Sequence, residues 1–289
     1  MNSDIIISTI NSLFGNLFSS IDTSIYSALD NITFINTDIL HSYYFEKLIG
    51  TNTSSGILLI ANSLLIGFVL YYSINYLLYS LNVIQSELPT PSQFFFKILI
   101  GGLLMNSSFF ICNEIIYINS LLSSAIRTLG QEQLNININF SELINRLNII
   151  INIESSTTNI FSIDGILKII FSFSFFNITF SYALRYVMIK IFILISPIAF
   201  LTLSTPSTSV FFKSWLKSFL ALLFVEILAS LILIIMFSIT YNTSDITSKL
   251  LLIGSIFALI KSNIYIRDFL GGISTDISDN MYILRNFIK

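Results

Sequence analysis

Charged side chains are scarce in this sequence, and their scarcity excludes the commonest class of protein. Of the 289 residues only 10% are charged, whereas 54% are hydrophobic, and the mean hydropathy is +0.82. A soluble domain carries about 25% charged residues, so this chain lacks the surface charge that an ordinary water-soluble protein needs. The net charge of −2 also gives no electrostatic basis for a nucleic-acid-binding face.

Histidine and cysteine are rarer still, with one residue of each, His41 and Cys112. One cysteine cannot close an intramolecular disulfide, and the pair cannot supply a His/Cys metal centre. The sequence also contains no phosphate-binding loop, no zinc-protease motif and no nucleophile elbow. We therefore expect no enzymatic activity, no catalytic residue, no metal site and no cofactor. If energy is needed, another subunit supplies it.

Long apolar runs are what the sequence does contain. Runs of about 20 residues can cross the roughly 30 Å hydrocarbon core of a bilayer as helices, so we expect an all-α polytopic membrane bundle. The first spans are predicted at 56–81 and 98–118, joined by a loop at 82–96 that contains Pro89 and Pro91. Residues 165–204 are apolar over roughly twice the length of one span, and further spans are predicted at 218–239 and around 250–260.

The stretch 165–204 decides how many times the chain crosses the membrane. Two crossings there would make six spans and would leave ten of the 14 basic residues outside, against the positive-inside rule. One net crossing places nine of the 14 inside. We therefore expect five net crossings, with the N-terminus outside and the C-terminus in the cytoplasm. Residues 187–204 then either extend one very long helix, kinked at Pro197, or form a re-entrant element that turns there.

Polar segments divide the chain into five predicted regions: an outside N-terminal region at 1–55, a two-span hairpin at 56–118, an outside loop at 119–164, a membrane core at 165–262 and a cytoplasmic tail at 263–289. Apolar residues recur at three- and four-residue intervals from Ile6 to Ile25, which predicts an amphipathic helix that lies on a membrane surface or against other helices.

Two shorter patterns lie in the predicted outside loop, and a third lies in the second span. The alternation from Leu134 to Phe140 predicts a short strand, and the residues from Ser141 onward predict a capped helix. The adjacent glycines Gly101 and Gly102 predict close packing of helices.

Glu226 lies inside the predicted span 218–239, and Glu114 lies near the outer end of the second span. Ionisable groups at membrane depth are costly and usually face a cavity or a partner. Glu226 is therefore a partner for a basic group in the bundle, a pore-lining acid, or a neutral carboxyl that is hydrogen-bonded to a neighbouring helix and purely structural. In the last case Glu226→Gln should be nearly silent.

The most distinctive pattern lies between Arg185 and Ile239. Arg185 is followed after ten residues by Ser196-Pro197-Ile198-Ala199, then by Pro206, and then by Phe211-Phe212-Lys213-Ser214-Trp215 and an apolar span. This pattern resembles the polytopic inner-membrane subunit of type IV secretion (conjugation) systems, the TrbL/VirB-type family. Elsewhere the similarity is architectural: chain length, outside N-terminus, five spans, a central outside loop and a cytoplasmic tail.

The resemblance implies a channel or channel-assembly component that moves DNA or protein across the cytoplasmic membrane. It also implies homo-oligomerisation and contact with other inner-membrane, periplasmic and ATPase subunits. The residues that it assigns to the assembly signature are Arg185, Ser196, Pro197, Ala199, Pro206, Phe212, Lys213 and Trp215.

Direct tight binding of DNA by the central loop is not expected, because strong phosphate binding needs several cations and the loop holds only Arg127 and Arg146. Two other functions stay open: the membrane subunit of a small-molecule transporter, and a structural scaffold without its own pore. No internal repeat of the kind found in transporters is evident.

Overall fold

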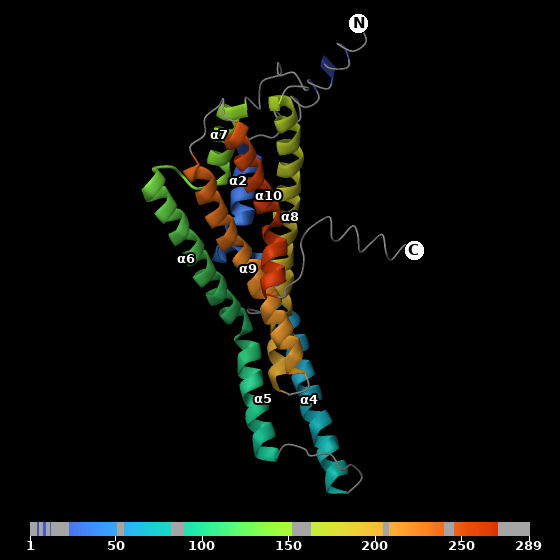
Figure 1. The fold of residues 1–289 in the computed structure, drawn as a ribbon. Coiled ribbons are helices and arrows are strands. Elements are labelled where there is room, and N and C mark those ends of the chain that lie inside the picture. Colours follow the sequence, from blue (N-terminus) through green and yellow to red (C-terminus); the bar gives the residue numbers. More distant parts are fainter. Residues whose placement is uncertain are drawn as a thin grey trace. The chain divides into compact units, whose positions relative to one another are not determined.

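The computed structural model describes residues 23–50, 55–81, 90–151, 163–204, 208–239 and 246–270, together with Ile5, Ser8, Thr9 and Ser12. All regular structure within these residues is helical (Figure 1). The elements in chain order are α2 (Thr23–Thr33), η1 (Thr37–Ile39), α3 (Tyr43–Ile49), α4 (Ile57–Ser80), α5 (Pro91–Asn106), α6 (Ser108–Leu134), α7 (Phe140–Ile151), α8 (Ile163–Leu201), η2 (Thr202–Ser204), α9 (Ser209–Ser238) and α10 (Ile246–Leu270).

Five helices are long and apolar enough to cross a membrane, namely α4, α6, α8, α9 and α10. The chain is therefore a multi-pass membrane protein with a helical fold, as the apolar runs predict. The predicted second span at 98–118 is misplaced, because the helix is interrupted at Ser107, between the end of α5 and the start of α6. The predicted loop at 82–96 also ends too late, since Pro91 occupies the first turn of α5, where its missing N–H costs no hydrogen bond.

The structure decides between the two interpretations of Pro197 in favour of one long helix. α8 continues through Pro197 to Leu201 and contains 39 residues, which corresponds to about 58 Å at about 1.5 Å per residue. Proline lacks an N–H, so the carbonyl of Ile193 loses its helical partner. The Ser196 hydroxyl donates to that carbonyl at 2.7 Å and so compensates for the missing bond.

α6 and α9 run in the same direction. Asn119 of α6 bonds Glu226 of α9, and Ser123 bonds Ser230 one turn further along both helices. Two parallel helices cross a membrane in the same sense, so the segment that connects them must make one net crossing between them. α8 is that crossing, and the parallel pair therefore supports five net crossings rather than six.

The chain forms two compact units that interleave in sequence. The first contains 1–35, 119–187 and 221–289, and the second contains 36–118 and 188–220. The core of the first unit is apolar and joins α2, α7 and α10 to the parts of α6, α8 and α9 that belong to it. Its fully buried residues include Leu29, Phe140, Tyr182, Leu233 and Leu259.

In the second unit α4 is strongly exposed, with only 6% of its most apolar window buried, as suits a helix that faces lipid or another chain. α5 packs closely on η2. The contact requires glycine at position 101, because a Cβ atom there would clash with the Ser204 hydroxyl. A Cβ atom on Gly102 would make only ordinary contacts, at 3.6 and 3.8 Å, with Leu65 of α4. Close packing at these glycines is thus required at the first position and not at the second.

The predicted outside loop at 119–164 differs from the structure, because residues 119–134 complete α6 and residues 140–151 form α7. The predicted strand from Leu134 to Phe140 is wrong. The chain turns there through Asn135, with φ of 54°, and a strand without a neighbouring strand has no partner for its backbone groups. The helix predicted at Ser141 is confirmed, although its cap is Asn139, whose side chain accepts from the Glu142 N–H at 2.7 Å.

The predicted N-terminal amphipathic stripe from Ile6 to Ile25 lies largely outside the described residues. The helix that follows it, α2, packs against α7 and belongs to the buried core of the first unit through Leu29.

Candidate functional site

A polar stripe on α6 marks the most unusual part of the first unit. Asn119, Ser123, Arg127 and Gly130 are spaced by four, four and three residues, so they share one face of the helix. Asn119 and Ser123 are buried, and a Cβ atom on Gly130 would lie 2.6 Å from the Ile234 side chain of α9. The stripe is therefore the surface on which α9 packs.

Glu226 of α9 and Arg185 of α8 form an ion pair beneath this stripe. The Glu226 Oε2 atom lies 3.8 Å from Arg185 Nη2, and both side chains are buried. The same carboxylate accepts a hydrogen bond from Asn119 Nδ2 at 3.0 Å, and the Ser123 hydroxyl lies 2.9 Å from the hydroxyl of Ser230. A carboxylate in an apolar bundle needs such a donor and an opposite charge to offset the loss of water.

The ion pair holds the C-terminal end of α2. Both Arg185 Nη1 and Nη2 donate to the backbone carbonyl of Thr33 at 3.2 Å, one of the last carbonyls of α2 that lack a helical partner. A cation at this position also complements the negative end of the helix dipole. Arg185 thus ties the end of α2 to α8, and its ion pair with Glu226 links this contact to α9.

Asp30 makes a second link between α2 and the rest of the unit. Its carboxylate accepts from the Phe140 N–H at 2.7 Å and from the Ser141 hydroxyl at 3.0 Å, so it caps the start of α7 from another helix. Burial raises the pKa of Asp30 above its ordinary value of 3.8, while these hydrogen bonds and the charge of Arg127 act in the opposite direction.

Arg127 completes the cluster and balances its charge. Its guanidinium lies 3.9 Å from the centroid of the Phe34 ring and interacts electrostatically with Glu226 and Asp30. Two arginines thus neutralise two carboxylates inside one compact unit. We call the set Asp30, Arg127, Arg185 and Glu226 the four-charge cluster.

Additional polar contacts join α8 to α10. The Tyr182 and Ser262 hydroxyls are 3.3 Å apart, and Asn263 Nδ2 donates to the Ser181 hydroxyl at 2.5 Å. All four residues are buried. These contacts place α10 beside the same stretch of α8 that carries Arg185, so polar bonds join α2, α6, α8, α9 and α10 in the first unit.

The four-charge cluster is suited to holding helices together. Arg185 and Glu226 are exposed by 0 and 1%, so neither is presented to a substrate, and their polar atoms bind backbone groups and neighbouring side chains. Such an arrangement holds the contributing helices together. Moving one helix away would separate the two charges and leave each of them buried and unpaired, at a large cost in free energy.

The other signature residues that the structure describes belong to the second unit and lie near the end of α8 or the start of α9, which we call the α8–α9 corner. Ser196 and Pro197 are buried within α8, as is Ala199. The Phe212 and Trp215 rings of α9 are 5.7 Å apart and lie 5.0 and 5.5 Å from the ring of Phe200.

Trp215 Nε1 also donates to the Phe192 carbonyl at 3.0 Å, so Trp215 is an interior anchor of the α8–α9 corner. Lys213 is exposed on α9. Pro206 lies outside the described residues.

Two members of the four-charge cluster, Asp30 and Arg127, do not stand out as functional residues in the sequence. The same holds for the neighbouring residues Thr33, Asn119 and Ser123. One signal was present: Asn119 and Ser123 are four residues apart, as are Glu226 and Ser230. Matched polar spacings on two apolar helices indicate that they face each other.

The chain matches no protein-family model, no curated protein and no solved structure. Its function is therefore inferred from the chemistry of its own residues.

Proposed function

We propose that this chain is a subunit of the inner-membrane channel of a type IV secretion system, and that it builds the channel together with other chains. In this proposal the N-terminus lies outside, the C-terminus lies in the cytoplasm, and the partners include further copies of the chain and periplasmic and ATPase subunits. DNA or protein is the transported substrate. The signature from Arg185 to Trp215 is the sequence feature that supports this assignment.

The observation that carries the proposed role is the enclosure of the four-charge cluster. The side chains that could line an aqueous path through the first unit, including Asn119, Ser123, Glu226 and Ser230, are buried against one another. DNA or a polypeptide is too wide to pass through such a packed interior. A passage for either would lie between chains, and this favours a channel-assembly component over a channel formed by one copy.

A small-molecule transporter needs a substrate site near the middle of the membrane, usually built from broken helices. Here Asn119, Ser123 and Arg185 inside the first unit are bonded to backbone or side chains of the same chain, and α8 is continuous. The exposed apolar surface of α4, which includes Leu59, Leu70 and Ile74, suits contact with lipid and neighbouring subunits.

The proposal is tested in cells that carry the chain in their native secretion system. Deletion should abolish transfer of DNA or protein, and a tagged copy should co-purify with the ATPase and periplasmic subunits of that system. A photo-crosslinker at Leu70 should trap a neighbouring subunit or the substrate in transit. Unchanged transfer after deletion would contradict the proposal, and crosslinks to subunits but never to substrate would assign a scaffold role.

Orientation is tested by cysteine labelling in a Cys112→Ser background. Asn145 on α7 and Ser214 on α9 are both exposed, and a cysteine at Asn286 reports on the C-terminus. We expect an impermeant reagent applied from outside to label only position 145. Labelling at 214 and 286 as well would mean six crossings and would favour the transporter.

A further inference from the structure

α3 has one face buried in the second unit and one face exposed. Phe45 and Ile49 are buried, and Lys190 Nζ of α8 lies 5.5 Å from the centroid of the Phe45 ring. On the opposite face Tyr44 is 78% exposed and Leu48 is 56% exposed. Lys47 is also exposed, and among the described residues it forms no ion pair.

Two glycines hold the end of α3 against the start of α4. Gly50 and Gly56 have φ of 89° and 128°, values that favour glycine. A Cβ atom on Gly50 would lie 2.5 Å from the Ser55 carbonyl oxygen, and one on Gly56 would lie 2.8 Å from the Leu48 carbonyl oxygen. This close backbone contact fixes the angle between the two helices.

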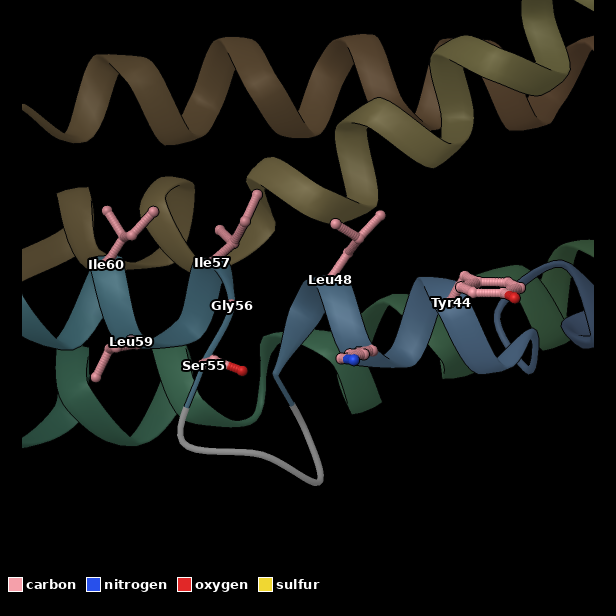
Figure 2. Close-up of a pocket in the computed structure, with 8 residues that line it drawn as sticks. Tyr44, Leu48, Ser55, Gly56, Ile57, Leu59 and Ile60 are labelled. Atoms are coloured by element: carbon pink, nitrogen blue, oxygen red, sulfur yellow. The ribbon is translucent and has the colours of Figure 1, made fainter.

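A groove of about 660 Å³ lies between α3 and α4 (Figure 2). Leu48 of α3 and Ile57 and Ile60 of α4 project to the same side of the ribbon. The lining is Tyr44, Lys47, Leu48, Ser55, Gly56, Ile57, Leu59 and Ile60. The groove is therefore mostly apolar and contains one charged side chain, a lysine.

The position of the groove along α4 places it at the edge of a bilayer. α4 is a candidate span that begins at Ile57, so Ile57, Leu59 and Ile60 enter the hydrocarbon region while Tyr44 and Lys47 remain at the level of the headgroups. Tyrosine and lysine are the residues that membrane proteins place at this level. The groove thus offers a cation at headgroup level and an apolar wall below it.

We propose that this groove binds an anionic glycerophospholipid from the bilayer. The Lys47 ammonium pairs with the headgroup phosphate, and an acyl chain lies along Leu59 and Ile60. Lipid rather than a soluble phosphate fits the lining, because seven of the eight residues that form it are uncharged and the apolar ones lie at the start of a membrane span. The site does not depend on the secretion role.

The test is native mass spectrometry of the full chain released from detergent, with phosphatidylglycerol or phosphatidylcholine added in turn. We expect phosphatidylglycerol to bind more tightly. Lys47→Ala should lower its affinity by about fivefold, the effect of one lysine near an anionic surface, and should leave phosphatidylcholine binding unchanged. Ile60→Trp fills the apolar part of the groove and should weaken both lipids.

Two matched variants separate the groove from general lipid attraction. Lys97→Ala removes an exposed lysine near the start of α5, and Leu70→Trp enlarges an exposed residue of α4 that does not line the groove. Both should bind phosphatidylglycerol as the wild type does. Equal losses in Lys47→Ala and Lys97→Ala, or no preference for the anionic lipid, would overturn the proposal. Lys47→Arg keeps the charge and should retain binding, which separates loss of the cation from misfolding.

Discussion

The Nη2 atom of Arg185 lies 3.8 Å from the Oε2 atom of Glu226, and neither side chain has more than 1% of its surface exposed. Arg185 belongs to α8 and Glu226 to α9, the two longest helices among the residues that the structure describes. The pair binds α2 through Thr33 and α6 through Asn119. A single ion pair therefore joins four helices, and substitutions at either position should affect all of them.

Removal of one partner should destabilise the fold more than removal of both. Glu226→Leu leaves Arg185 buried without its counter-charge, so we expect the free energy of unfolding to fall by about 3–5 kcal/mol. Arg185→Met should cost a similar amount. The double variant should lose much less than the sum, because no uncompensated charge remains. Unfolding of the purified chain in detergent micelles measures all three, and additive losses would contradict the pairing.

Glu226→Gln distinguishes a charged from a neutral carboxyl at this position. Viewed from the sequence alone, a structural role for Glu226 predicts a nearly silent substitution. The contact with Arg185 changes that expectation, because glutamine keeps an acceptor for Asn119 but removes the negative charge. We now expect a clear loss of stability in the same unfolding measurement. A silent Glu226→Gln would mean that the charge of Arg185 is satisfied by the Thr33 carbonyl alone.

Asp30 should make stability depend on pH. Burial raises its pKa in the folded chain above 3.8, so the folded state holds the proton more tightly than the unfolded state does. The corresponding stability is complete below pH 3.8 and is lost as the pH rises through the raised pKa. Asp30→Asn does not titrate, so its stability relative to the wild type should increase across that window. Unfolding free energies of the two proteins over a pH series provide the check.

A second substitution at Asp30 tests its role as a cap. Asp30→Ala removes the acceptor for the backbone of α7 and should cost about 1 kcal/mol of unfolding free energy, the usual value for loss of a helix cap.

In the pH series, parallel profiles for the wild type and Asp30→Asn would refute the assignment of the titration to Asp30.

Ser196 and Pro197 should show energetic coupling. Ser196→Ala leaves the Ile193 carbonyl without a partner inside α8, so we expect a loss of about 1–3 kcal/mol. Pro197→Ala restores a backbone N–H that can bond the same carbonyl. Ser196→Ala should therefore cost less in a Pro197→Ala background than in the wild type. A double-mutant cycle on unfolding free energies measures the difference, and equal costs in both backgrounds would exclude this compensation.

Gly101 and Gly102 form a matched pair for testing the packing of α5. Gly101→Ala brings a Cβ atom against the Ser204 hydroxyl and should destabilise the second unit by about 1–3 kcal/mol. Gly102→Ala meets only the Leu65 side chain at 3.6 Å or more and should be tolerated. Ser204→Ala removes the obstructing hydroxyl and should recover part of the loss in Gly101→Ala. Equal unfolding temperatures for the two alanine variants would contradict the close contact with η2.

Hydropathy predicted the helical class and the presence of membrane-spanning helices, because both depend on the length of apolar runs, whereas the distribution of basic residues favoured five net crossings over six. It placed Asn119 and Ser123 in an outside loop because these side chains are polar, whereas the structure buries them against Glu226 and Ser230. A polar residue prefers water only when no partner is available inside the protein, and a hydropathy average contains no information about partners. For the same reason, hydropathy could not show that Arg185 and Glu226 pair with each other.

Trp215 shows a related limit at the level of one side chain. Tryptophan near a lysine is typical of the membrane surface, but here its N–H bonds the Phe192 carbonyl of α8 and its ring packs on Phe200 and Phe219. The sequence identifies an amphipathic ring with one polar atom. Whether that atom meets water or a carbonyl depends on the turn between α8 and α9.

The link from Arg185 to Thr33 has a consequence for biosynthesis, since it spans 152 positions of the chain. Thr33 leaves the ribosome long before Arg185, and Arg185 leaves it before Glu226, a delay on the order of seconds at ordinary rates of translation. During that interval α8 carries an unneutralised arginine. A truncated chain that ends before α9 would keep this charge exposed in the membrane, where quality-control proteases could distinguish it from the finished protein.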